Sequence, residues 1–179
     1  MQKIKLLLIG FLGLVILFTV IGLVMPSTVK ISRGVIVDAD SAKVVAMISD
    51  VHTWPEWMVW LSSGQGSLVK FKTDGKTSSV KWHTLEQKSS GEISLLNLDG
   101  DIIHLRHQFP GMNPADGGIR VRSVNPVQTE ILWMIEYPLK WYPWERFEGI
   151  FMDAMIGQSL EQSLKLLEEK LRFVSMKAA

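Results

Sequence analysis

An apolar run near the N-terminus restricts the fold of this chain more than any other feature. Residues 6–25 carry no charge, and this length matches the roughly 20 residues with which an α-helix crosses a ~30 Å hydrocarbon core. Pro26 ends the run, because proline cannot continue the hydrogen-bond ladder of a helix. The sequence therefore predicts a transmembrane anchor over residues 1–26, which contacts the membrane through residues 6–25.

Two other interpretations of the run remain, a signal peptide and a buried core helix. A signal peptide has an apolar region of only about 7–15 residues and a small-residue cleavage site, and residues 22–26 offer no such site. Lys3 and Lys5 flank one end, whereas the next basic residues lie inside an expected strand. The positive-inside rule then places the N-terminus in the cytoplasm and residues 27–179 on the outer side.

Composition excludes several functions. The net charge is +1 and the basic residues form no cluster, so no nucleic-acid partner is expected. The absence of cysteine excludes disulfides, thiolate nucleophiles and cysteine-ligated metals. No nucleotide-binding, dinucleotide or serine-hydrolase motif is present. We therefore predict no cofactor.

The four histidines suggest no metal site. His104 and His107 are three residues apart, which on a strand directs them to opposite faces. No third ligand follows at metal-binding spacing. His83 and His107 are either surface residues or general bases within a cavity, and spacing nominates no catalytic residue.

The order of the elements predicts an α+β fold. Strands and helices are segregated along the chain, which favours an antiparallel sheet. Such a long sheet curls, and its concave face must be filled. The C-terminal helix carries an apolar stripe and is long enough to fill it. We expect strands at 29–38, 77–85, 91–98, 101–109, 117–124 and 129–137, turns at 64–66 and 73–75, a short helix at 42–49 and a long helix at 144–172.

The spacing of three tryptophans predicts a second short helix, after the one at 42–49. Trp54, Trp57 and Trp60 are three apart, which places them on one side of a helix. They form either a core face against the sheet or the mouth of a cavity.

Several phrases resemble the SRPBCC superfamily, which includes START domains and polyketide cyclase/dehydrase-like proteins. Ile48-Ser49-Asp50 followed by Trp54-Pro55-Glu56-Trp57 resembles an opening found in its membrane-anchored bacterial branch. Trp133 and the closing helix match as well, so the resemblance covers residues 29–172. It implies a helix-grip fold, a curved antiparallel sheet around a long C-terminal helix, over residues 27–173, with 174–179 as a tail.

This resemblance implies the bacterial cytoplasmic membrane as the location. It does not decide function, because the fold hosts carriers, enzymes and regulators. Residues 64–75 depart from the family pattern, since a glycine-rich hairpin is often found there and this stretch is short and polar.

Strand alternation nominates the lining of a cavity. The candidates are large apolar residues that share the inward face of their strands, joined by two residues of the long helix. A pocket of this kind suits a lipid or another apolar small molecule. The candidates are Trp82, Leu95, Leu105, Val121, Trp133, Phe151 and Met155.

An aromatic segment precedes the long helix. Trp141 and Tyr142 lie between two prolines and Trp144 follows the second one, in a segment that is expected at the surface. They either pack against the domain, contact the membrane interface that tryptophan and tyrosine favour, gate a ligand, or bind a protein partner.

Three functions follow. The first is a membrane-tethered binding module for a hydrophobic small molecule or lipid, which the missing catalytic set favours. The second is a cyclase/dehydratase-like enzyme, which needs His83 or His107 to meet Glu130 or Asp153 inside the pocket. The third is an accessory subunit of a membrane protein complex.

Overall fold

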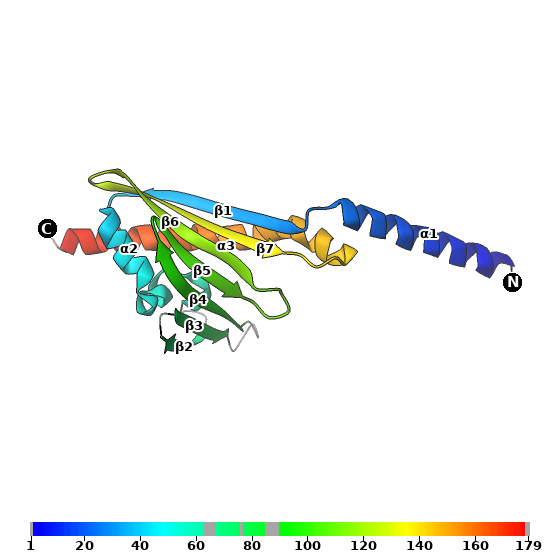
Figure 1. The fold of residues 1–179 in the computed structure, drawn as a ribbon, viewed down its shortest axis with the longest axis horizontal. Coiled ribbons are helices and arrows are strands. Elements are labelled where there is room, and N and C mark those ends of the chain that lie inside the picture. The colour runs from blue at the N-terminus through cyan, green and yellow to red at the C-terminus, as the bar shows by residue number, and fades with distance from the viewer. Residues whose placement is uncertain (1, 63–66, 76, 85–89, 178–179) are drawn as a thin grey trace.

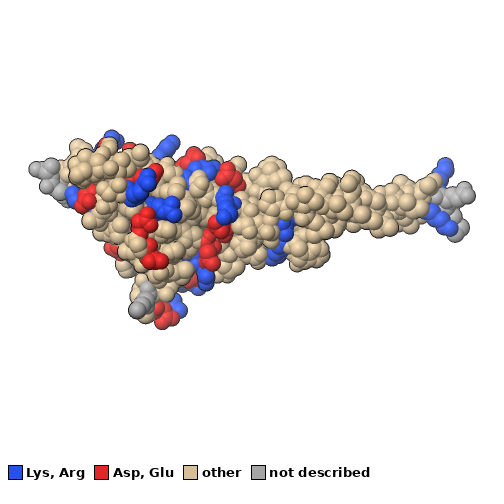
Figure 2. Space-filling model, turned by 45° about the horizontal axis from the view of Figure 1, so that its top comes forward, with Lys and Arg blue, Asp and Glu red and all other residues tan. Residues whose placement is uncertain are grey.

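The N-terminal helix projects from the rest of the molecule (Figure 1). The computed structural model describes residues 2–62, 67–75, 77–84 and 90–177. Helix α1, Gln2–Val24, is the one helix among them that is long and apolar enough to cross a membrane. Figure 2 shows charged side chains over the body of the molecule, whereas α1 displays none until its tip.

A seven-stranded antiparallel sheet forms the body, which confirms the predicted antiparallel sheet and adds one strand to the six expected. Its order is β1-β7-β6-β5-β4-β3-β2, so consecutive strands pair from β2 to β7 and β1 closes the far edge. The turn between β4 and β5 is tight, and Gly100 takes the positive φ that it requires; Gly75 at the end of β2 also has a positive φ. The strands are β1 Thr28–Val37, β2 Ser67–Asp74, β3 Thr77–Thr84, β4 Ser90–Asp99, β5 Ile102–Gln108, β6 Ala115–Asn125 and β7 Gln128–Pro138.

The sequence did not predict β2, which forms the edge of the sheet beside β3. The expected turn at 73–75 falls at Gly75, which directly follows β2, whereas the one at 64–66 lies outside the described residues. Val69 and Phe71 alternate with Lys70 and Lys72, so the period of a strand is present. The alternation is short and lies between two turn signals, so the pattern does not distinguish the segment from a polar connection.

The two faces of the sheet differ in chemistry. Ion pairs join residues that stand directly opposite each other on neighbouring strands, which is a stable arrangement on a solvated face. The other face is apolar and forms the core. The exposed pairs are Lys30–Glu136, Lys81–Glu92, Arg106–Asp116 and Arg122–Glu130.

Three short helices close one end of the core. Helix α2, Ser41–Ser49, starts at Asp40, whose side chain accepts a hydrogen bond from the Ala42 amide. Two 3-10 helices follow, η1 Val51–Glu56 and η2 Val59–Leu61. Trp54 and Trp57 are buried, which confirms the core-face interpretation, and their indole nitrogens donate to Ile48 O and Thr53 Oγ1.

Helix α3, Pro143–Lys177, covers the apolar face with only its C-terminal half (Figure 1). Leu160, Leu164, Leu167 and Leu171 are buried there, as predicted. The predicted stripe is wrong before Gly157. Its residues Phe147, Ile150, Phe151 and Ala154 are exposed or half-buried, and Gly149, Met152 and Ile156 turn inward instead.

The helical repeat explains this correction. The predicted stripe recurs about every 3.5 residues, whereas a straight helix turns once every 3.6, so such a stripe rotates steadily around the helix. Over the length of α3 the N-terminal part of the stripe leaves the sheet and faces outward.

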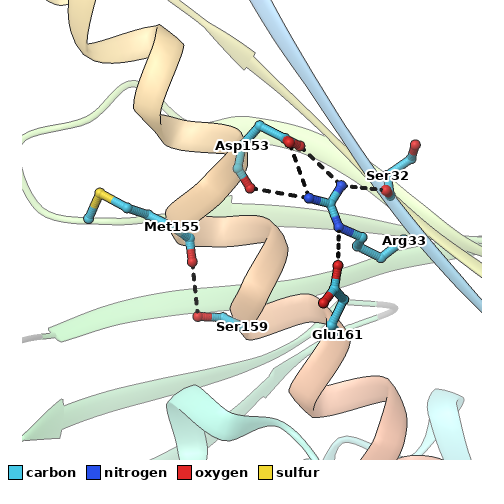
Figure 3. A network of polar contacts seen from close by, with 6 residues as sticks. All are labelled: Ser32, Arg33, Asp153, Met155, Ser159 and Glu161. Carbon is cyan, nitrogen blue, oxygen red and sulfur yellow. Dashed lines mark hydrogen bonds and ion pairs between the residues drawn. The ribbon is translucent and has the colours of Figure 1, made fainter.

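Arg33 of β1 fixes α3 against the edge of the sheet (Figure 3). Its Nε donates to Glu161 Oε1 at 2.7 Å, and Nη1 and Nη2 donate to the two Asp153 carboxylate oxygens at 3.1 Å each. Hydrogen bonds to Asp153 and Glu161 raise the pKa of Arg33 further above its usual value. A Cβ at Gly157 would overlap the guanidinium, so glycine provides the space in which it lies.

We predict that Arg33→Gln lowers the free energy of unfolding by about 1–2 kcal/mol, because it removes several charge-assisted hydrogen bonds of a mostly shielded side chain. Lys30→Gln is the matched control on the same strand, where a fully exposed pair contributes at most about 0.5 kcal/mol. Urea unfolding of the full chain in detergent measures both. Equal stability of the two variants would contradict this role of Arg33.

Candidate hydrophobic ligand-binding site

Seven aromatic side chains gather on the concave face of the sheet. Trp60 of η2 lies edge-on to Phe109 at 5.5 Å and to Trp133 at 5.9 Å between ring centroids. His107 stands beside Trp133 at 6.1 Å, and Phe109 beside Tyr137 at 6.3 Å. We call this group the aromatic cluster; its members are Trp57, Trp60, Trp82, His107, Phe109, Trp133 and Tyr137.

Three polar groups of the aromatic cluster make no hydrogen bond of good geometry among the described residues, although the backbone of Ala115 lies close enough to His107 to raise its pKa. They are both ring nitrogens of His107, Nε1 of Trp133 and the hydroxyl of Tyr137. All three side chains are buried. A buried polar atom without a partner costs about 1–3 kcal/mol, and Trp54 and Trp57 avoid that cost with their own hydrogen bonds. The interior therefore contains polar atoms within the aromatic cluster, where packing alone favours apolar ones.

Burial keeps these groups uncharged. Desolvation lowers the pKa of His107 to about 4, while the backbone of Ala115 and the charge of Asp116 act in the opposite direction. Desolvation also raises the pKa of Tyr137 above its usual value. At neutral pH the imidazole thus has one donor and one acceptor nitrogen, and the phenol keeps its proton.

A glycine on the neighbouring strand makes room for Trp82. A Cβ at Gly91 of β4 would overlap the six-membered ring of Trp82. The indole can therefore lie across β4 and reach Phe109, with ring centroids 5.7 Å apart.

Three hollows open beside the aromatic cluster. A mouth of about 370 Å³ is lined by Trp60, Phe109 and Met155. A second hollow of about 620 Å³ lies between the β5–β6 loop and the first turns of α3, and Tyr137 forms part of its wall. A third of about 580 Å³ reaches Trp82 and Phe109 from the β3–β4 side. Met112 borders all three, so they meet at the β5–β6 loop.

The structure places the predicted cavity residues in two environments. Trp82 and Trp133 belong to the aromatic cluster, and only Trp82 lines a hollow. Trp133, Leu105 and Val121 are buried in the core without lining these hollows. Leu95 is half-buried against the same core.

The two predicted helix residues lie on the rim. Phe151 is 66% exposed and Met155 is 70% exposed, so neither faces the strand residues across the core as expected. Both instead line the hollow of about 620 Å³. A ligand contact remains a prediction for all seven candidates.

The acid–base pair that the enzyme hypothesis requires is not assembled. Glu130 pairs with Arg122 on the solvated face, and Asp153 is held by Arg33. His83 is exposed. His107 is fully buried, which corrects its interpretation as a surface or edge residue. Within the described residues, no three His, Asp or Glu side chains group as metal ligands.

Sequence reasoning missed Phe109 and Tyr137 as site residues, whereas a cavity mouth was one of the two positions predicted for Trp60, which lines one. Tyr137 continues the alternation of Trp133 and Ile135 along β7, so periodicity alone could have nominated it. Phe109 follows the last residue of β5, where strand periodicity no longer applies.

The aromatic segment before α3 lies at the surface. Trp141 is 64% and Trp144 is 65% exposed. Tyr142 stacks on Trp144 with ring centroids 5.0 Å apart and contacts Trp141 at the same distance. These contacts hold the three rings in one exposed group, and their role toward a membrane or a partner remains a prediction.

No family model matches the sequence, and no curated protein is significantly similar to it. Solved structures match its fold. The Zhui aromatase/cyclase from Streptomyces sp. R1128 covers 81% of this chain and 94% of its own at 15% identity and a TM-score of 0.63. A START superfamily protein from Mycobacterium smegmatis covers 82% and 99% at 17% identity and a TM-score of 0.62.

Norcoclaurine synthase from Thalictrum flavum, solved with dopamine and hydroxybenzaldehyde, covers 84% of this chain and 90% of its own, with 12% identity and a TM-score of 0.62. The sheet, the short helices and α3 therefore form a helix-grip domain. These likenesses confirm the predicted fold.

The buried imidazole of His107 predicts a pH dependence of stability. Its pKa is about 4 in the folded chain and 6.5 when unfolded, so between these values the unfolded state binds more protons. The contribution of His107 to the free energy of unfolding is fully present above pH 6.5. It falls by about 3 kcal/mol as the pH drops to about 4. His107→Leu should remove this slope.

His104→Leu is the control, because His104 lies on the other face of the same strand and is only half-buried. Urea unfolding at several pH values between 4 and 7 measures the slope for each chain. A slope that survives in His107→Leu and not in His104→Leu would contradict the assignment.

Proposed function

We propose that this protein binds a hydrophobic small molecule or lipid within its helix-grip domain and is held at the membrane by α1. The observation that carries the proposal is the set of polar groups without partners on His107, Trp133 and Tyr137, in an aromatic cluster whose members Trp60, Phe109 and Tyr137 line hollows with mainly apolar walls. A ligand with an apolar body and a hydroxyl or carbonyl group matches both features, since it fills the hollows and provides hydrogen-bond partners.

A close joint between α1 and α3 supports the tether. The backbone of Pro143 approaches Gly22 so closely that a Cβ on the glycine would overlap it. Phe18 meets Phe147 with ring centroids 5.4 Å apart, and Arg146 Nη1 donates to Met25 O at 2.7 Å. Cleavage of a signal peptide would remove the α1 side of this joint, whereas an uncleaved anchor keeps it. The asymmetry of Lys3 and Lys5 supports a domain on the outer side of a bacterial cytoplasmic membrane.

The binding proposal is tested by native mass spectrometry of the full chain, purified gently from its own membrane, and by extraction of the retained molecule. We expect a retained hydrophobic ligand. Titration of that ligand should show about tenfold weaker binding to His107→Leu and to Tyr137→Phe, because each loses about one hydrogen bond. His104→Leu should bind as the native chain does.

An empty chain that also fails to bind lipids in titration would overturn the proposal. A chain that is empty and always accompanied by other membrane proteins would favour the accessory-subunit hypothesis instead. Equal affinity of all three variants would show that the ligand does not reach the aromatic cluster.

A further inference from the structure

An apolar groove runs between the membrane-length helix and the first turns of α3. Its volume is about 690 Å³. One wall is formed by Leu14, Val15 and Phe18 of α1, and the other by Trp144, Phe147 and Phe151 of α3. The joint at Gly22, Phe18 and Arg146 holds the two walls together, so the groove is a fixed feature of the fold.

The depth of the groove identifies what surrounds it. A helix rises about 1.5 Å per residue, so Phe18 lies about 10 Å before Met25 along α1, and Leu14 about 16 Å. The hydrocarbon layer of one leaflet is about 15 Å thick. If α1 crosses the membrane and Met25 marks its exit, the groove faces the acyl chains of the outer leaflet. Trp141 and Trp144 then occupy the interfacial zone that tryptophan favours.

The groove continues toward the aromatic cluster. It shares Trp144, Glu148 and Phe151 with the hollow of about 620 Å³ beside the β5–β6 loop. That hollow shares Met112 and Met155 with the mouth that exposes Trp60 and Phe109. The outward rotation of the α3 stripe leaves Phe151 and Met155 exposed along this line. A mainly apolar surface therefore extends from α1 to Trp60 and Phe109, with Glu145 and Glu148 as charged residues along it.

We infer that the groove binds an acyl chain of a lipid in the outer leaflet and passes it sideways along α3 into the domain. This inference rests on the proposed function and adds the source of the ligand and its entry path. Helix α1 is then a wall of the entry path as well as a tether. A chain that moves in this way stays in contact with apolar surface and does not cross water.

The experiment uses the full-length protein in vesicles of phosphatidylcholine that contains a photoreactive diazirine on one acyl chain. Val15→Trp places a bulky ring in the groove. Leu17→Trp is the matched control, because Leu17 is two residues away on the same helix, is exposed, and does not line the groove. After irradiation, mass spectrometry maps the labelled peptides.

In the native chain we expect labels on Phe147 and Phe151 in the groove and on Trp60 and Phe109 in the interior. Val15→Trp should reduce interior labelling at least fivefold, and Leu17→Trp should leave it unchanged. Each chain is also loaded with the same lipid from detergent micelles, where entry from a bilayer is not needed, and we expect equal interior labelling of all three.

The two loading conditions separate the inference from the proposed function. Equal interior labelling of both variants in vesicles would overturn the entry path while the binding function stands. The path also fails if α1 is labelled evenly around its circumference and α3 is not labelled. An interior that remains unlabelled in vesicles and in micelles would overturn the binding function, and the entry path with it.

Discussion

The partial cover that α3 gives to the curled sheet is the constraint on which the rest of the structure depends. One helix must fill the concave face, and its inward leucines do so only from Leu160 onward. Arg33 holds the helix at the turn where this cover begins, with its guanidinium over Gly157. Before that turn the helix continues past the sheet toward α1. The hollows next to the aromatic cluster lie where the helix leaves the sheet incompletely covered.

Polar groups in the interior make the empty domain less stable than an entirely apolar core would. Aromatic rings supply large apolar surfaces in fixed geometry, yet His107, Trp133 and Tyr137 bring polar atoms into the same volume without partners among the described residues. In surroundings of low dielectric such groups are costly when unpaired and strongly attractive to a partner. A domain selected for packing alone would replace them with apolar residues. Sites that bind ligands commonly retain such a cost, because the groups that destabilise the empty fold recognise the ligand.

Much of the fold follows from sequence patterns. The apolar run predicts α1, and alternation predicts every strand except β2, where Val69 and Phe71 alternate with lysines over too short a stretch. The site was less accessible. Trp82 and Trp133 could be nominated because large apolar residues alternate with polar ones on their strands. The burial of His107 could not be predicted. Periodicity indicates which face of the sheet a residue occupies, but not whether a polar side chain finds a hydrogen-bond partner. Phe151 and Met155 were predicted to face inward because the apolar stripe looks continuous over a few turns. Its slow rotation becomes apparent only over the length of a long helix.

The most direct measurement is nitrogen-15 NMR of the full chain with labelled histidines, with its retained ligand bound and again after the ligand has been extracted. A ligand that reaches the aromatic cluster will form a hydrogen bond with the neutral imidazole of His107, so its ring-nitrogen shifts should change on extraction. His52 and His104 lie outside the aromatic cluster and the three hollows beside it, so they serve as internal references. Unchanged shifts of His107, with a ligand demonstrably bound and then removed, would contradict binding at the aromatic cluster.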